Sequence, residues 1–170
     1  MKKLTLVVAG TLLFSFAASA QDMSMYNRGL SAFNSGDFDT AAQLFYELTE
    51  TATEGEVRAK SEYYLAQSLV KKGLPVSALT YYVAILRAGG KHPNYLKAVE
   101  ALVNVQQQLD DQEFIPKELD THYSEEWATL PLEVLSRINY LIGTRSFRSS
   151  KFDEAKALFE AIPKESSIYV

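Results

Sequence analysis

Residues Tyr26 to Leu48 read YNRGLSAFNSGDFDTAAQLFYEL, and this stretch decides the fold class. It predicts two antiparallel helices joined by a tight turn at Ser35-Gly36-Asp37. Gly29 and Ala32 in the first helix are small enough to let the second helix approach closely. A single hairpin cannot bury an apolar stripe by itself, so we expect further copies along the chain. In the second helix the apolar residues recur every three or four positions and form such a stripe: Phe38, Ala41, Leu44, Phe45 and Leu48.

Two further stretches repeat this pattern. YYLAQSLVKKGLPVSALTYYVAIL begins at Tyr63, and its Gly73 and Ala78 each lie 37 residues after Gly36 and Ala41. YLIGTRSFRSSKFDEAKALFEAI begins at Tyr140. Its small residue, alanine and aromatic residue each lie 114 residues after Gly29, Ala41 and Phe45, at Gly143, Ala155 and Phe159.

These spacings resemble those of the tetratricopeptide repeat family, whose period is roughly 34 residues. The matched features are the small residue of the first helix, the turn glycine, and the alanine and aromatic residue of the second helix. The match is weaker in the third copy, where Val103 replaces the small residue and Pro116 interrupts the second helix. In the fourth copy Ser150 replaces the turn glycine.

The resemblance implies an all-α fold, a right-handed α-solenoid of three to four helical hairpins spanning residues 21–170. We expect repeats at about 24–53, 57–90, 93–128 (degenerate) and 131–163, with the start of a further repeat at 166–170. On this interpretation Val170 is a cut and not a natural end. The last repeat would then expose apolar residues that drive self-association through the C-terminal repeat: Leu158, Ile162, Ile168 and Tyr169.

The N-terminus has the features of a secretory signal peptide. Residues 1–20, MKKLTLVVAGTLLFSFAASA, combine a basic start, a short apolar run and an Ala18-Ser19-Ala20 end. We expect cleavage between Ala20 and Gln21, with an uncleaved membrane anchor as the alternative. The chain contains no cysteine, so it carries no lipid-attachment cysteine. We therefore expect a protein of the periplasm, or a secreted one.

Composition and motifs argue against several classes of function. The net charge is −4, and the chain has no run of basic residues, which argues against nucleic acid as a partner. None of the common catalytic or nucleotide-binding motifs is present, so we expect neither an enzyme nor a small-molecule substrate. We expect His92 to be a solvated loop residue. We expect no metal and no cofactor. The alternative is a metal site at His122 with Asp120, Glu125 and Glu126, but the spacing of these residues matches no compact ligand motif.

The resemblance also assigns a concave groove for partners. The alternative is that the residues assigned to this groove, listed below, pack on neighbouring helices within a tight superhelix. The set lacks the basic and Asn residues that chaperone-binding relatives use to clamp a carboxylate. Carried over position by position, the groove residues are Tyr26, Leu30, Phe33, Asn34, Tyr63, Gln67, Val70, Lys71, Tyr140, Thr144, Phe147 and Arg148.

The sequence therefore predicts a non-catalytic scaffold of the cell envelope that binds a peptide or helix of a protein partner in this groove. The alternative is the N-terminal part of a longer repeat subunit in an envelope complex. The resemblance leaves open whether that complex serves gliding motility, outer-membrane biogenesis, polysaccharide handling or cell division.

Overall fold

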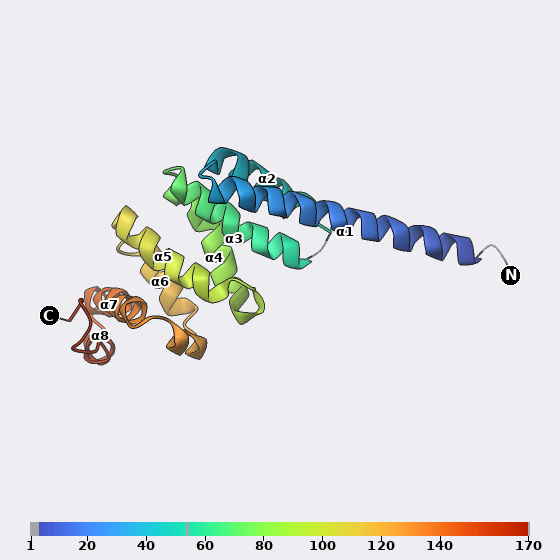
Figure 1. Ribbon diagram of the computed structural model, residues 1–170. Coiled ribbons are helices and arrows are strands. Elements are labelled where there is room, and N and C mark those ends of the chain that lie inside the picture. The colour runs from blue at the N-terminus through green and yellow to red at the C-terminus, as the bar shows by residue number, and fades with distance from the viewer. Residues whose placement is uncertain (1–3, 54, 170) are drawn as a thin grey trace. The chain divides into compact units, whose positions relative to one another are not determined.

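The computed structural model describes residues 4–53 and 55–169, with side chains from residue 19 onward. The fold is all-α, as the sequence predicts, and the described residues contain no strand (Figure 1). Short 3-10 helices follow α4 (Gly89–Lys91) and α6 (Glu125–Thr129). The α-helices are α1 (Leu4–Asn34), α2 (Phe38–Thr51), α3 (Gly55–Lys71), α4 (Pro75–Ala88), α5 (Tyr95–Leu109), α6 (Phe114–Thr121), α7 (Leu132–Arg148) and α8 (Phe152–Glu160).

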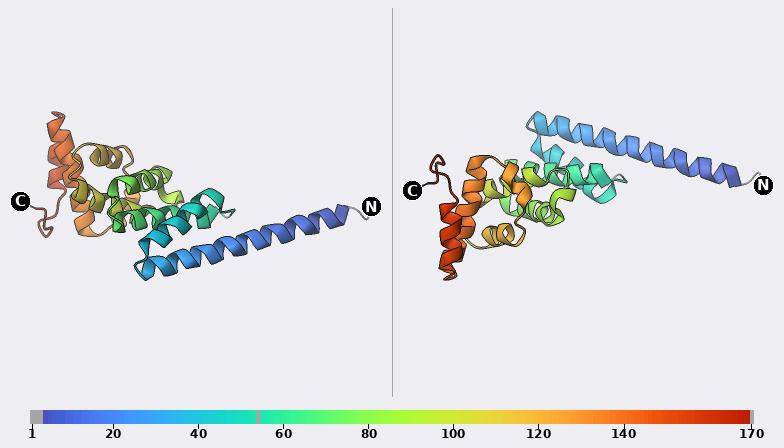
Figure 2. Two further views of the ribbon diagram at one scale, coloured as in Figure 1. Left: turned by 90° about the horizontal axis from the view of Figure 1, so that it is seen from above. Right: turned by 90° about the horizontal axis from the view of Figure 1, so that it is seen from below.

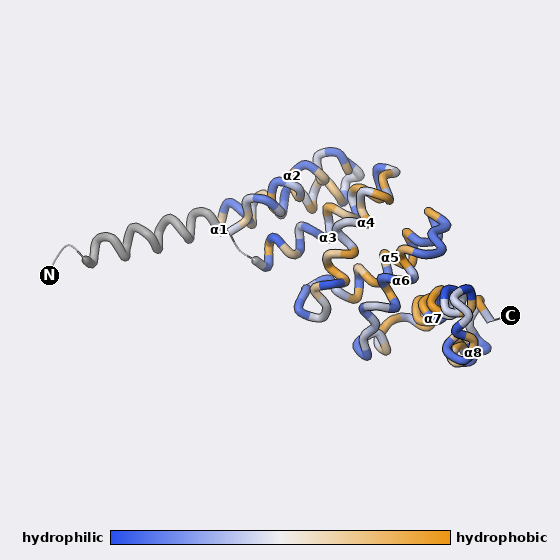
Figure 3. Tube along the Cα trace, turned by 180° about the vertical axis from the view of Figure 1, so that it is seen from behind, coloured by the Kyte–Doolittle hydropathy of each residue, from blue (hydrophilic) through white to orange (hydrophobic). Residues whose placement is uncertain are grey.

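The chain forms two compact units, one ending at Leu74 and the other beginning at Pro75. The first contains α1, α2 and α3, and the second contains α4 to α8. In each unit the helices interleave apolar and polar residues along their length, as amphipathic helices do (Figure 3). The two helices of the second predicted repeat, α3 and α4, therefore belong to different units.

Helix α1 is longer than the sequence pattern indicates. We expected the first helix of the hairpin to begin near residue 24, but α1 begins at Leu4 and runs without a break to Asn34. No proline interrupts this stretch, so nothing in its backbone ends the helix. The proposed signal peptide lies mostly on residues 1–18, whose side chains are outside the described part, and it stays a prediction. Among the described residues, no helix combines the length and the apolar character needed to cross a membrane.

The same turn closes three helices. Gly36, Gly73 and Ser150 all have positive φ, at 83°, 77° and 60°. Each of the three donates its N–H to the carbonyl three residues earlier, and the next residue donates to the carbonyl five residues earlier. This is the hydrogen-bonding pattern that ends a helix with one left-handed residue, and it explains the recurring turn glycine. Ser150 adopts the same conformation without glycine's freedom.

The irregular third copy still forms two helices, α5 and α6. We expected Pro116 to interrupt the second helix, but Pro116 lies in the first turn of α6, two residues after the helix begins at Phe114, where a missing N–H breaks no intrahelical bond. Beyond α6, Trp127 is fully buried, and its indole N–H donates to the hydroxyl of Tyr95 at 2.7 Å. This bond joins the 3-10 helix after α6 to the start of α5.

Charged side chains also link the helices of the second unit. Glu118 on α6 accepts two hydrogen bonds from the Arg87 guanidinium of α4, at 2.8 and 3.0 Å, and these bonds lower the pKa of Glu118. Arg145 on α7 pairs with Glu113 and Asp120, both at 3.1 Å. His92 is 8% exposed and accepts a hydrogen bond from the Asn94 N–H through Nδ1. Our expectation of a solvated His92 was therefore wrong, because the loop that carries it folds onto the helices.

Candidate functional site

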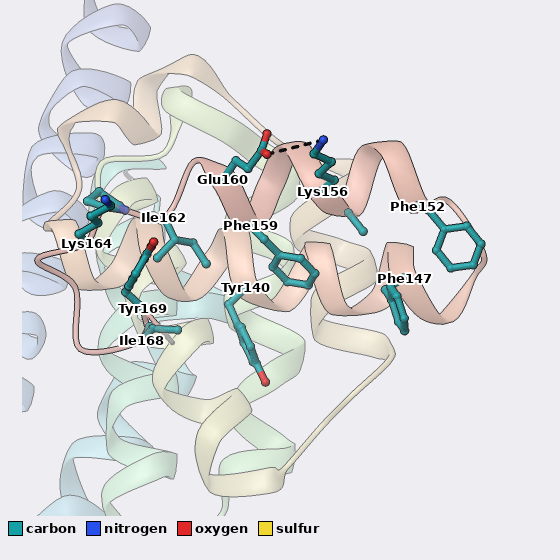
Figure 4. Close-up of a pocket in the computed structure, with 12 residues that line it drawn as sticks. Tyr140, Phe147, Phe152, Lys156, Phe159, Glu160, Ile162, Lys164, Ile168 and Tyr169 are labelled. Carbon is teal, nitrogen blue, oxygen red and sulfur yellow. Dashed lines mark ion pairs between the residues drawn. The ribbon is translucent and has the colours of Figure 1, made fainter.

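A surface cavity with a mainly apolar lining lies on the last hairpin. A cavity of about 860 Å³ opens between α7, α8 and the residues that follow α8. Figure 4 shows its side chains in a row, with Phe147 and Phe152 near the turn and Tyr140 and Phe159 in the middle. Ile162, Ile168 and Tyr169 close the far end. We call this surface the aromatic face: Tyr140, Phe147, Phe152, Phe159, Ile162, Ile168 and Tyr169. The α7–α8 hairpin that carries it can be followed in both views of Figure 2.

Much of the aromatic face is open to solvent. Phe147 and Phe152 are 57% and 59% exposed, although their rings pack edge to face at 5.4 Å. Tyr140 is 39% exposed, and its ring lies 6.3 Å from that of Phe159. Four large aromatic rings next to one another on a helical hairpin are the kind of patch that binds another protein.

The first hairpin, α1–α2, carries the same arrangement 114 residues earlier. Its counterparts of Tyr140, Phe147, Phe152 and Phe159 are Tyr26, Phe33, Phe38 and Phe45. The rings of Phe33 and Phe38 lie 5.5 Å apart at 71°, against 5.4 Å and 69° for Phe147 and Phe152. Tyr26 and Phe45 lie 5.8 Å apart. The two hairpins therefore present nearly the same aromatic geometry.

In the first unit this aromatic surface is covered by α3. The Tyr64 ring of α3 stacks on Phe45 at 5.4 Å and meets Tyr26 and Phe33 edge to face at 6.1 and 5.6 Å. Phe45 is completely buried as a result. Burial, with a smaller contribution from Tyr64, raises the pKa of Tyr26 to about 12. The place that Tyr64 fills on α1–α2 corresponds to the cavity on α7–α8.

The segment after α8 returns to the start of α7. The Glu133 carboxylate accepts hydrogen bonds from both hydroxyls of Ser166 and Ser167 and from the Ser167 N–H, at 2.8 to 3.1 Å. The Ser167 N–H bond is the main cause of the lowered pKa of Glu133. In the first unit, Asp22 accepts from the N–H and hydroxyl of Thr53 in the same way, both at 2.8 Å. Thr53 lies 114 residues before Ser167. In both hairpins, therefore, a carboxylate of the first helix binds the segment that follows the second helix.

The predicted groove residues divide by hairpin. Tyr26 and Phe33 contact Tyr64 of α3, as the packing alternative foresaw for these two positions, whereas Tyr140 and Phe147 line the cavity. Tyr63 accepts a hydrogen bond from Gln67 at 3.0 Å and has its ring 5.5 Å from Tyr64. Leu30, Val70 and Thr144 are half-buried, while Asn34, Lys71 and Arg148 are exposed.

Five residues of the aromatic face were not in that set: Phe152, Phe159, Ile162, Ile168 and Tyr169. Phe152 and Phe159 come from the second helix of the hairpin, and the groove assignment took only first-helix positions. Their 114-residue spacing from Phe38 and Phe45 was the available signal. Of the four residues expected to be exposed at this end, Tyr169 is 48% exposed and Leu158 and Ile168 are half-buried. Ile162 is only 6% exposed and was wrongly expected to be open.

The alternative metal site at His122 is not assembled among the described residues. His122 Nε2 lies 3.7 Å from Glu118, whose carboxylate is engaged by Arg87. No group of three or more potential metal-ligating side chains occurs among the described residues.

Comparison with known proteins finds no matching family model, no matching curated protein and no matching solved structure.

Proposed function

We propose that this protein is a non-catalytic interaction scaffold, built from tetratricopeptide-like helical hairpins, that binds a protein partner on the aromatic face. The observation that supports this most directly is the pair of equivalent aromatic surfaces, one covered by α3 and one carrying an open cavity. Each Å² of apolar surface that a partner removes from water stabilises the complex by about 25 cal/mol. A partner that covers Phe147 and Phe152 gains the stabilisation that α3 supplies to the first hairpin.

The proposed setting is the cell envelope of a bacterium. The support is the sequence of residues 1–20, with its basic start, apolar run and Ala-Ser-Ala end. The expected product begins at Gln21, and the intact mass of the exported protein decides this. A membrane-bound product that keeps residues 1–20 would instead show that the segment is an anchor.

The scaffold role is tested by affinity capture from envelope extract. We would compare the wild-type protein with a Phe147→Ser/Phe152→Ser double variant. The matched control is Tyr46→Ser/Tyr123→Ser, since these aromatic residues are 54% and 60% exposed but lie outside the aromatic face. We expect one or more proteins to be retained by the wild type and the control and lost with the double variant. Equal capture by all three would contradict a role for this face.

The non-catalytic part of the proposal has its own test. A panel of ester, peptide, phosphate and glycoside substrates should show no turnover above a denatured sample. Reproducible turnover that is abolished by denaturation would show that the protein is an enzyme.

A further inference from the structure

Two of the contacts between α3 and the first hairpin show which side chains a helix needs in order to bind there. The first is the Tyr64 ring, which sits among Tyr26, Phe33 and Phe45. The second is an ion pair at the other end of the contact, where Lys72, which directly follows α3, meets Asp39 in the first turn of α2 at 2.5 Å. An aromatic ring and a cation eight residues apart, about 12 Å along a helix, therefore identify the occupant.

The last hairpin keeps the receiving groups for both contacts. Its aromatic rings match those of the first hairpin, as described above. The counterpart of Asp39 is Asp153, again 114 residues later and again in the first turn of its helix. Asp153 is exposed, and the two lysines closest to it in the sequence are paired elsewhere, Lys151 with Glu154 and Lys156 with Glu160. An incoming cation would thus meet an available carboxylate.

A third contact of α3 is not carried over. Arg58 donates to the carbonyl of Ala52 at 2.6 Å. The counterpart of Ala52 is Ser166, whose carbonyl already accepts a hydrogen bond from the N–H of Tyr169. An arginine at this position of the occupant is therefore not required.

We propose that the aromatic face binds an amphipathic helix of a partner protein in the pose that α3 adopts on α1–α2. This helix places an aromatic side chain between Tyr140, Phe147 and Phe159. It places a lysine or arginine eight residues later, opposite Asp153. The inference deepens the proposed function by naming the shape and chemistry of the partner segment, and it rests on that function.

A second copy of this chain is a poorer occupant. Its α3 has the required sequence, but that helix is already packed against its own α1–α2 hairpin through Tyr64. Removing it would expose Phe45, which is completely buried. If the second copy instead offered its own aromatic face, the lysines that line both cavities, Lys156 and Lys164, would be brought near one another.

The test uses α3 itself as the probe. A fluorescein-labelled, hydrocarbon-stapled peptide of residues 55–72, GEVRAKSEYYLAQSLVKK, is titrated into the full chain and followed by fluorescence anisotropy. We expect saturable binding at one site. A peptide with Tyr64→Ala should bind at least about tenfold more weakly, because the ring is the main anchor. The protein variant Phe152→Ser should reduce binding comparably, while its circular dichroism spectrum stays that of the wild type.

The charge contact is tested by exchange. Asp153→Lys in the protein should weaken binding of the unmodified peptide by about two- to fivefold, the range expected of an exposed ion pair. A peptide carrying Lys72→Glu should recover this loss with the Asp153→Lys protein. The matched control is Asp39→Lys, which alters the equivalent position of the covered hairpin and should leave peptide affinity unchanged.

Four results would overturn the inference. They are no saturable binding, binding unaffected by Phe152→Ser, binding lost equally with Asp39→Lys, or a dimer in sedimentation whose formation excludes the peptide. The last of these would assign the face to a second copy of the chain. Peptide binding that is lost when the chain is extended beyond Val170 would assign the face to the further repeat expected from residues 166–170. Capture of a partner through Phe147 and Phe152 without peptide binding would leave the scaffold role standing and reject the α3-like pose. Failure of both experiments would reject both.

Discussion

Gly143 lies so close to the ring of Phe159 that a β-carbon added at the glycine would approach the ring carbon Cε1 to 2.7 Å. The same relationship holds in the first hairpin, where a β-carbon at Gly29 would lie 2.8 Å from Cε1 of Phe45. What differs is the freedom of the ring. Phe45 is completely buried beneath Tyr64, whereas Phe159 borders a cavity.

Alanine at these two glycines should therefore have different effects. Overpacking costs roughly 1–3 kcal/mol, and replacing a helical glycine with alanine returns about 1 kcal/mol. We expect Gly29→Ala to lower the free energy of unfolding by about 1 kcal/mol, because Phe45 cannot move. Gly143→Ala should leave it nearly unchanged, because Phe159 can tilt into the cavity. Urea denaturation followed by circular dichroism measures both, and equal losses would mean that Phe159 is as confined as Phe45.

Removal of the ring that covers the first hairpin should be costly. Tyr64→Ala deletes four ring pairs, three with the first hairpin and one with Tyr63. At about 0.5–1.5 kcal/mol each, we expect a loss of roughly 2–6 kcal/mol in the free energy of unfolding. The control Tyr46→Ala, at a residue 54% exposed on α2, should change it by less than about 0.5 kcal/mol. Tyr64→Ala should also bring the pKa of Tyr26 down from about 12 towards 10, since the Tyr64 ring that helps to bury Tyr26 is gone. An absorbance titration in which Tyr26 still ionises near 12 would show that something else buries it.

The left-handed turn at Ser150 gives a stabilising substitution. Its φ of 60° suits glycine, and a side chain there costs about 1 kcal/mol. We expect Ser150→Gly to raise the free energy of unfolding by about that amount. Ser149→Gly is the matched control, because Ser149 has φ of −86° and glycine would bring no relief. If both variants are destabilised alike, the strain inferred at Ser150 is absent.

The Arg87–Glu118 contact predicts how stability depends on pH. Hydrogen bonds from Arg87 lower the folded-state pKa of Glu118 below its ordinary value of 4.5. A carboxyl with a lowered folded pKa contributes stability above the unfolded pKa and loses it as the pH falls through the folded value. Glu118→Gln should thus be less stable than the wild type at pH 7, and the difference should shrink below pH 4.5.

The fluorescence of Trp127, the only tryptophan of the chain, reports unfolding of the unit that contains Glu118. Glu125→Gln, at an exposed carboxylate of the same unit, is the control and should match the wild type at both pH values. A stability difference for Glu118→Gln that stays constant from pH 7 to pH 3.5 would contradict the ionic contribution.

The all-α fold and the hairpin turns followed from local patterns in the sequence. Gly36 and Gly73 marked turns because a left-handed residue ends each helix, and the structure has positive φ at both. The spacing of Gly29 and Phe45, repeated at Gly143 and Phe159, reflects a contact made within one hairpin. Such features depend on residues close in sequence, so the sequence carries them.

Burial set by distant segments could not be predicted in the same way. His92 follows a glycine pair and precedes a proline, a pattern typical of exposed loops, yet the loop is folded onto the helices. Whether an aromatic hairpin is covered depends on how the next helix lies, as Tyr64 shows for Tyr26 and Phe33. Helix α1 also begins earlier than the repeat pattern indicates, at Leu4, because no proline interrupts the apolar segment between Leu4 and residue 24.

We propose that the two hairpins present equivalent aromatic surfaces, one covered by α3 and one available to a partner helix. Thiol modification tests it without background, since the chain has no cysteine. In separate variants Phe33→Cys and Phe147→Cys, we would measure the rate of alkylation with and without the stapled peptide of residues 55–72, relative to the unfolded rate. We predict alkylation at least about tenfold faster at position 147 than at position 33, and slowed by the peptide at position 147 alone. Equal rates at the two positions, with no protection by the peptide, would contradict the claim.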